Sequence, residues 1–259
     1  MKQNALYVAV RLESEGTPHW SPVGLLQFRA GTYCFVYTKG ARSAPGFQLF
    51  AGMGCLDTVY ESTELFPVFA NRMLSESRPE YDAYLRWTGF DRTGRPDPIA
   101  ILGVTEGIRR TDSIELFPLP IPDKRGRYVN RFFLHGLRHM SAQTKERVAT
   151  LKAGELLHWE FENLNGTDKN AVSLNTSTDQ VLLGYVPRYL AQDFRKLTLP
   201  CTSDFLRLTV CRVNTDAPLQ QRLLCELDAL WPDGFKPCSG DEFQSIPTEA
   251  ATTCTASYR

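Results

Sequence analysis

The sequence Asn-Gly-Thr-Asp-Lys-Asn-Ala-Val at residues 165–172 is followed, after a second polar turn, by Leu-Gly-Tyr-Val-Pro-Arg at residues 183–188. Asn, Gly, Thr and Asp favour a turn because their short side chains bond nearby backbone groups and glycine accepts left-handed geometry. The alternating apolar residues that follow are typical of a strand, and residues 180–186 predict a second one. We therefore expect a β-hairpin whose loops carry polar side chains.

Composition narrows the class of protein. The chain has 259 residues, enough for one or two domains, and 42% hydrophobic residues, enough for a packed core. Its formal net charge of zero gives no overall attraction to nucleic acid, although residues 125–200 carry an excess of Lys and Arg. The seven scattered cysteines lack zinc-binding spacing, so we expect free thiols, no metal and no cofactor. Without a long apolar run or a signal peptide pattern, a cytoplasmic protein with no membrane association is expected.

Hydrophobic periodicity predicts an α+β protein with two domains. In the first half, strands are expected at 6–10, 23–28 and 33–37, helices at 65–74 and 81–87, and a β-prone piece at 99–104. In the second half, strands are expected at 128–134, 158–161 and 206–213, and helices at 141–151, 187–196 and 219–229. Prolines clustered at 117–122 predict the boundary. The expected units are a domain at 1–122, a domain with a C-terminal helix at 123–238, and a flexible tail at 239–259.

Four separated motifs resemble the HIRAN domain over about residues 128–215, and they occur in the right order. They are Gly136-Leu137-Arg138, Gly154-Glu155, Asn165-x-x-Asp168-x-Asn170-Ala171-Val172 and Gly184-Tyr185-Val186-Pro187-Arg188. The resemblance implies a small β-barrel-like module, here with flanking helices, that captures single-stranded DNA at its 3′-hydroxyl end.

The same resemblance assigns roles to charged residues. Arg138 would bind a phosphate through its guanidinium, although a lone arginine is more often a surface or salt-bridged residue. Asp168 would accept a hydrogen bond from the terminal hydroxyl and reject a 3′-phosphate. The alternative for Asp168 is an Asx-turn with the backbone of Asn170. Lys169 and Arg188 are candidate phosphate contacts.

Two ring side chains complete the expected DNA site. His139 stands where the family carries a stacking aromatic, and a histidine stacks more weakly. Thr167 likewise replaces an aromatic that often precedes the aspartate. Tyr185 could restore stacking, and a role as a half-buried strand tyrosine is its alternative.

The first half is similar to the N-terminal subdomain of HipA-type toxin kinases. The resemblance lies in Val23-Gly24-Leu25-Leu26, the aromatic strand at 33–37 and Leu65-Phe66-Pro67-x-Phe69-Ala70-Asn71-Arg72-Met73-Leu74. The chain has no Gly-rich phosphate loop and no kinase catalytic set, so kinase activity is not expected. No helicase motif, nuclease ligand set or catalytic triad is present either.

We therefore expect a non-catalytic protein that binds single-stranded DNA and recruits a protein partner through residues 1–122. The alternative is a kinase-less regulatory or partner-binding subunit of a toxin–antitoxin-like complex of the HipA type.

Overall fold

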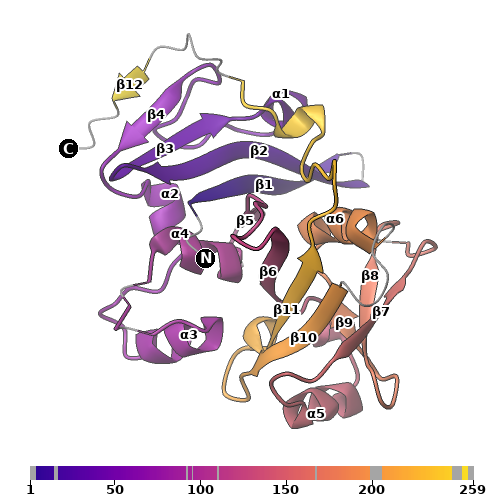
Figure 1. Cartoon of the computed structure of the whole chain (residues 1–259). Coiled ribbons are helices and arrows are strands. Elements are labelled where there is room, and N and C mark those ends of the chain that lie inside the picture. Colours follow the sequence, from indigo (N-terminus) through magenta and orange to yellow (C-terminus); the bar gives the residue numbers. More distant parts are fainter. Residues whose placement is uncertain are drawn as a thin grey trace. The chain divides into compact units, whose positions relative to one another are not determined.

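In the computed structural model the chain forms two compact units, whose elements are labelled in Figure 1. Unit 1 consists of Met1–Tyr81, Thr93–Leu119 and Cys238–Arg259, and unit 2 of Asp82–Arg92 and Pro120–Pro237. The structure describes residues 4–14, 17–91, 93–94, 96–109, 111–166, 168–198, 206–246 and 253–255. Sheets and helices occur in both units, which confirms the predicted α+β class.

Unit 1 contains one sheet with the strand order β12-β4-β3-β2-β1-β5. Its strands are β1 (Ala5–Ser14), β2 (Thr17–Arg29), β3 (Thr32–Tyr37), β4 (Val59–Ser62), β5 (Ile114–Pro118) and β12 (Thr253–Thr255). All neighbours are antiparallel except β12, which pairs in parallel with β4. The three strands predicted in this half are confirmed. In β3, for example, Tyr33, Phe35 and Tyr37 are buried at alternating positions, so one face of the strand enters the core.

Short helices surround this sheet, and two of them differ from prediction. The helices are α1 (Lys39–Ser43), α2 (Pro67–Ala70) and α4 (Pro98–Thr105), and α3 (Tyr81–Thr88) lies almost wholly in unit 2. The helix expected at 65–74 is limited to α2. The β-prone reading of 99–104 is wrong because Asp97 accepts a hydrogen bond from Ile99 N at 2.9 Å, which caps α4. Proline at the first helical position, Pro98, also fits a helix start.

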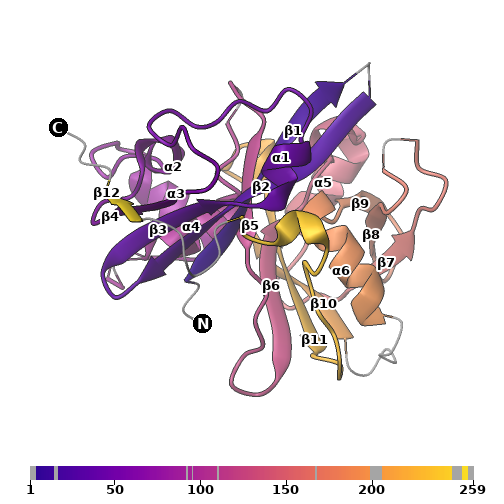
Figure 2. The same cartoon turned by 90° about the horizontal axis from the view of Figure 1, so that it is seen from above.

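The segment after unit 2 returns to the first sheet. The turn η4 (Asp241–Phe243) lies beside α1 and β2, as the yellow ribbon in Figure 2 shows. Lys39 Nζ donates to Asp241 Oδ1 at 2.7 Å, and Ile246 N donates to Tyr37 O at 2.9 Å. Part of the segment predicted as a flexible tail is therefore hydrogen-bonded to unit 1.

Unit 2 contains two three-stranded antiparallel sheets. One has the order β10-β11-β6 and the other β7-β8-β9. Their strands are β6 (Arg127–Phe133), β7 (Leu157–Phe161), β8 (Val172–Thr176), β9 (Leu182–Tyr185), β10 (Leu206–Val213) and β11 (Leu223–Leu230). The predicted hairpin is β8–β9, and the strands predicted at 128–134, 158–161 and 206–213 are β6, β7 and β10. All of these are confirmed.

The predicted β-barrel is wrong, since no sheet of the described residues closes into a barrel. Isolated bridges join the two sheets instead, His135 with Tyr185 and Leu156 with Thr209. The two sheets are thus connected only by an isolated bridge at each of these two places in the described residues, and not by a continuous strand pairing.

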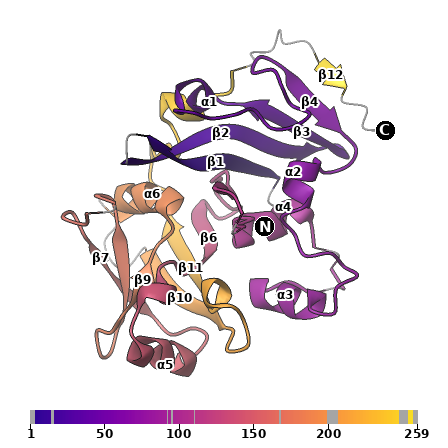
Figure 3. The ribbon, with the colours of Figure 1, turned by 180° about the vertical axis from the view of Figure 1, so that it is seen from behind.

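Besides α3, unit 2 contains the helices α5 (Ala142–Thr150) and α6 (Arg188–Thr198), both predicted. Figures 1 and 3 show them at opposite ends of the β7–β8–β9 sheet. The helix predicted at 219–229 is wrong. A short turn, η3 (Leu219–Gln221), is followed by β11, which pairs with β10 on one side and β6 on the other. The apolar residues of this segment fit both a helical and an alternating pattern, and the pairing of β11 on both edges decides for a strand.

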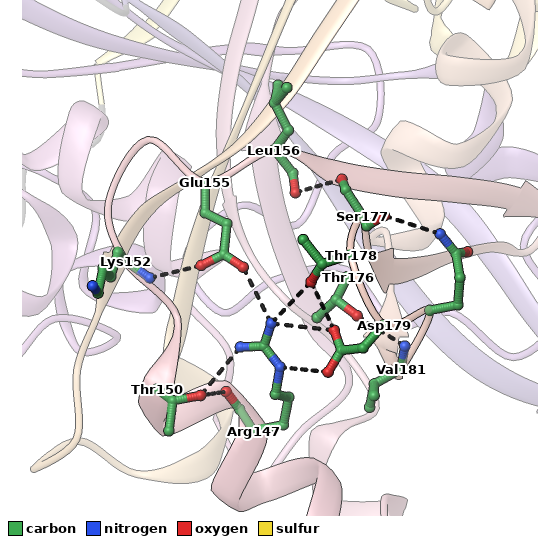
Figure 4. Close-up of polar contacts among 11 residues, drawn as sticks. Arg147, Thr150, Lys152, Glu155, Leu156, Thr176, Ser177, Thr178, Asp179 and Val181 are labelled. Carbon is green, nitrogen blue, oxygen red and sulfur yellow. Dashed lines mark hydrogen bonds and ion pairs between the residues drawn. The ribbon is translucent and has the colours of Figure 1, made fainter.

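One polar cluster joins α5 to the β8–β9 turn (Figure 4). Arg147 Nε donates to Asp179 Oδ2 at 2.9 Å, and Arg147 Nη2 donates to Glu155 Oε1 at 3.3 Å. The other oxygen of Glu155 accepts from the backbone N of Lys152 at 3.1 Å. The motif residue Glu155 therefore contributes to the fold of unit 2.

The domain limits expected at 1–122 and 123–238 stay a prediction. None of the helices in the described ranges is long and apolar enough to cross a membrane.

Candidate nucleic-acid interface

The first and last motifs meet at the bridge between β6 and β9. His135 N donates to Tyr185 O and Tyr185 N donates to His135 O, both at 2.9 Å. This close approach requires glycine at Gly184, because a Cβ there would lie 2.3 Å from His135 O. Gly136 adopts φ +81°, and a Cβ on it would lie 3.0 Å from Tyr185 Cδ2. Two segments separated by almost fifty residues are thereby held in contact.

Asp168 lies in a turn between β7 and β8 that its own side chain stabilises. Asp168 Oδ1 accepts from Asn170 N at 2.9 Å, which is the Asx-turn considered from the sequence. Asp168 N donates to Asn165 Oδ1 at 3.1 Å, and Ala171 N donates to Asp168 O at 2.9 Å. The carboxylate is thus fixed in orientation by backbone bonds on both sides of it.

The second oxygen of Asp168 pairs with the first residue of α6. Arg188 Nε lies 3.2 Å from Asp168 Oδ2, and the side chains are 25% and 18% exposed. Sequence analysis gave Arg188 a separate role as a phosphate contact, whereas the structure pairs it with Asp168. The pair is close to electrically neutral, so the negative charge of Asp168 is offset where it stands.

Tyr185 belongs to the bridge after β6, and its side chain contacts Glu162, a residue that sequence analysis did not select. The Tyr185 hydroxyl donates to Glu162 Oε2 at 3.4 Å, and Asn165 Nδ2 donates to the same oxygen at 2.8 Å. The pKa of Tyr185 is raised by burial and by the neighbouring Glu162 carboxylate. Glu162 and Asn165 therefore connect Tyr185 with the turn that carries Asp168.

Arg138 and His139 lie in the turn η1 (Leu137–His139), which follows Gly136. Both side chains are exposed, and Arg138 Nε donates to His139 Nε2 at 2.8 Å. Lys145 Nζ donates to Arg138 O at 3.4 Å and adds a positive charge next to the turn.

The structure therefore brings together most of the predicted site. Asp168, Arg188 and Tyr185 belong to one network, and Arg138 and His139 follow the glycine that contacts Tyr185. Lys169 is exposed in the Asp168 turn, and Thr167 lies outside the described residues.

An open hollow lies beside this network. It has a volume of about 450 Å³ and is lined by residues 161–165, which include Glu162 and Asn165. Phe161 forms one side of it, with the Arg195 guanidinium carbon 4.5 Å from the ring centroid. Within the described ranges, no group of three or more His, Cys, Asp or Glu side chains is arranged to hold a metal ion.

Comparison with known families identifies this region. Residues 128–228 match the HIRAN domain. The chain carries a HIRAN domain. The match begins in β6 and ends in β11, so it includes both sheets of unit 2 and all six predicted site residues. The resemblance seen in the sequence ended near residue 215 and left out β11.

Two crystal structures are similar to part of this chain. A protein from Lactobacillus plantarum has 22% identity, with a TM-score of 0.31, over 40% of this chain and 97% of its own. The HIRAN domain of human HLTF has 16% identity, with a TM-score of 0.29, over 41% of this chain and 81% of its own. No curated protein matches the chain. The resemblance of residues 1–122 to the HipA-type subdomain stays a prediction.

Proposed function

We propose that the HIRAN domain of this chain binds the 3′-hydroxyl end of single-stranded DNA, without catalysing a reaction on it. The observation that carries the proposal is the network that joins Asp168, Arg188 and Tyr185 next to the exposed Arg138. These are the positions to which the family resemblance assigns contacts with the DNA end. A fixed carboxylate beside exposed cations suits a strand end, where a hydroxyl follows the last phosphate.

Asp168 receives the terminal hydroxyl in this proposal. Asp168 Oδ1 accepts a hydrogen bond from Asn170 N and Oδ2 forms an ion pair with Arg188 Nε, and an ionised carboxylate oxygen has capacity for a further bond. The Arg188 pair also reduces the repulsion between Asp168 and the phosphate next to the end. A neutralised aspartate can therefore contact a hydroxyl in a polyanion.

Arg138 and Lys169 hold phosphates in this arrangement, because both are exposed and positively charged. Tyr185 and His139 contact the terminal base by stacking, which is worth about 1–3 kcal/mol per base for aromatic side chains. With so few phosphate contacts, affinity should fall shallowly as salt is raised.

The test is fluorescence anisotropy with a short single strand labelled at its 5′ end, prepared with a 3′-hydroxyl, a 3′-deoxy or a 3′-phosphate terminus. The hydroxyl end is expected to bind most tightly. Asp168→Asn should remove the difference between the hydroxyl and deoxy ends, because that difference reports the hydrogen bond alone. Equal binding of these two ends by the unaltered protein would contradict end capture.

Arg138→Ala should weaken all three strands and reduce the slope of log affinity against log salt by about 1. Arg207→Ala is the matched control. Arg207 is also an exposed arginine of unit 2. It lies on β10 opposite Asp228 of β11, which in turn lies opposite Val129. Val129 is near the start of β6, whereas Gly136 follows the end of that strand.

Residues 1–122 would bring a protein partner to the captured end. The alternative, a partner-binding subunit of a HipA-type complex, predicts instead that the purified chain binds none of the three strands at low salt and co-purifies with a kinase chain.

A further inference from the structure

Two carboxylates lie next to the proposed DNA end, and their charges are balanced differently. Asp168 is paired with the Arg188 guanidinium at 3.2 Å. Glu162 accepts only from neutral donors in the part of the chain that the structure describes, the Tyr185 hydroxyl and the Asn165 amide. No Lys, Arg or His among those residues forms an ion pair with it. The uncompensated negative charge of the site therefore belongs to Glu162.

Glu162 also occupies a central position in the network. Its carboxylate is joined to Tyr185, whose ring lies against Gly136 at the start of the turn that carries Arg138. On its other side Asn165 bonds both the carboxylate and the backbone N of Asp168. Two hydrogen bonds therefore hold the Glu162 carboxylate between Tyr185, the candidate base contact, and the turn that carries Asp168. Glu162 also lines the adjoining hollow.

We propose that Glu162 is the residue that determines specificity against a 3′-phosphate end. The inference rests on the proposed function and reassigns one part of it. Asp168 recognises the hydroxyl by accepting its hydrogen bond, and Glu162 rejects a terminal phosphate by charge.

The physical reason is the difference between a paired and an unpaired carboxylate. A terminal phosphate monoester carries about 1.5 to 2 negative charges at neutral pH. Beside the Asp168–Arg188 pair this group meets an attraction and a repulsion that largely cancel. Among the described residues Glu162 has no such ion-pair partner, so its charge repels the phosphate without the compensation that Arg188 gives at Asp168. Specificity of this kind comes from an interaction that is unfavourable with the wrong ligand.

The experiment uses the full chain and the three strands described above, with Glu162→Gln as the main variant. Glutamine keeps the size of the side chain and an oxygen that accepts from Tyr185. The ratio of hydroxyl-end to phosphate-end affinity is expected to fall at least about tenfold, while the ratio of hydroxyl-end to deoxy-end affinity stays within about twofold. Each ratio is measured on one protein sample, so a partly unfolded fraction cancels.

Three further variants test whether rejection of the phosphate end depends on Glu162 and not on a neighbouring residue. Asp168→Asn should change the hydroxyl-to-deoxy ratio and retain rejection of the phosphate end. Tyr185→Phe removes the hydroxyl bonded to Glu162 but leaves the charge, so it should also retain that rejection. Glu160→Gln, an exposed carboxylate two residues earlier on β7, is the matched control and should change neither ratio.

The outcomes separate this inference from the function on which it rests. If the unaltered protein binds none of the strands, the proposed function fails. If it prefers the hydroxyl end and Glu162→Gln rejects the phosphate end as strongly as before, the assignment to Glu162 is overturned while end capture stands. If Tyr185→Phe reproduces the effect of Glu162→Gln, the residue acts by orienting Tyr185, and rejection by charge is overturned.

Discussion

Arg188 Nε lies 3.2 Å from Asp168 Oδ2 and joins the first turn of α6 to the loop between β7 and β8. Each residue was selected from the sequence for a contact with DNA, and the structure gives them a contact with each other. The pair therefore has two consequences, one for the stability of the loop and one for the charge that a DNA end meets.

Replacing both partners should reveal a measurable coupling. Because both side chains are less than one-third exposed, the coupling free energy from Arg188→Ala, Asp168→Ala and the double variant is expected to be about 0.5–1 kcal/mol. Urea unfolding of the four proteins measures it. The same cycle with Lys196 and Asp193, which are 4.0 Å apart and involve a more exposed lysine, should give a smaller value. Additive effects at positions 168 and 188 would contradict the pairing.

Gly184→Ala should separate the two motifs that form the site. The new Cβ would lie 2.3 Å from His135 O, so the bridge between β6 and β9 must open. We expect a loss of at least about 2 kcal/mol in the free energy of unfolding, because the shift breaks two backbone hydrogen bonds and disturbs packing. Gly166→Ala is the control, since no atom lies within 4 Å of its added Cβ. Equal stabilities of the two variants, by thermal unfolding, would contradict this reading of Gly184.

Much of the fold could be predicted where local signals agree. A helix was expected at 141–151, and the hydroxyl of its first residue, Ser141, caps α5 by accepting from Thr144 N at 3.1 Å. Predictions failed at 99–104, a nearly continuous apolar run, and at 219–229, whose apolar residues fit both a helical and an alternating pattern. A local cap, Asp97, decides the first case and pairing with distant strands decides the second. Strand pairing of that kind is not visible in the segment itself.

The sequence predicted which residues belong to the candidate site but not which of them contact one another. The motifs selected Asp168, Arg188 and Tyr185, yet the pairing of Asp168 with Arg188 depends on how α6 packs against the loop. Glu162 was not selected from the sequence. Its signal was the spacing of Glu162, Asn165 and Asp168 at intervals of three residues, which suits side chains bonding to one another along a turn.

The contact between Arg147 and Asp179 should make the free energy of unfolding depend on pH. The pKa of Asp179 is held below its usual range chiefly by the hydrogen bond from Arg147, which Figure 4 shows. A depressed carboxyl pKa stabilises the fold above the unfolded-state value of about 4, and the contribution is lost as pH falls through the folded-state value.

Arg147→Ala is therefore expected to lower the free energy of unfolding at neutral pH, because the contact with the ionised Asp179 is lost. The difference from the unaltered protein should shrink progressively below about pH 4. Urea unfolding at several pH values measures both quantities. Lys145→Ala on the same helix serves as the control. A difference that is constant down to acidic pH would exclude the Asp179 contact as its source.

Tyr185 offers a test of the Glu162 contact that needs no DNA. Its pKa is raised above the ordinary value by burial and by the Glu162 carboxylate, because the phenolate would stand beside a negative charge and lose its donated hydrogen bond. The neutral side chain thus contributes stability in full below the unfolded-state pKa of about 10, and the contribution is lost as pH rises through the folded-state pKa. Ultraviolet titration of the protein, with the Tyr185→Phe curve subtracted, isolates this one residue. Glu162→Gln should lower its pKa towards the ordinary value while burial keeps part of the shift, and Glu160→Gln should leave it in place. If the titration of Tyr185 is the same with glutamate and glutamine at position 162, the two side chains are not in contact in solution, and the charge assigned to the site must come from elsewhere.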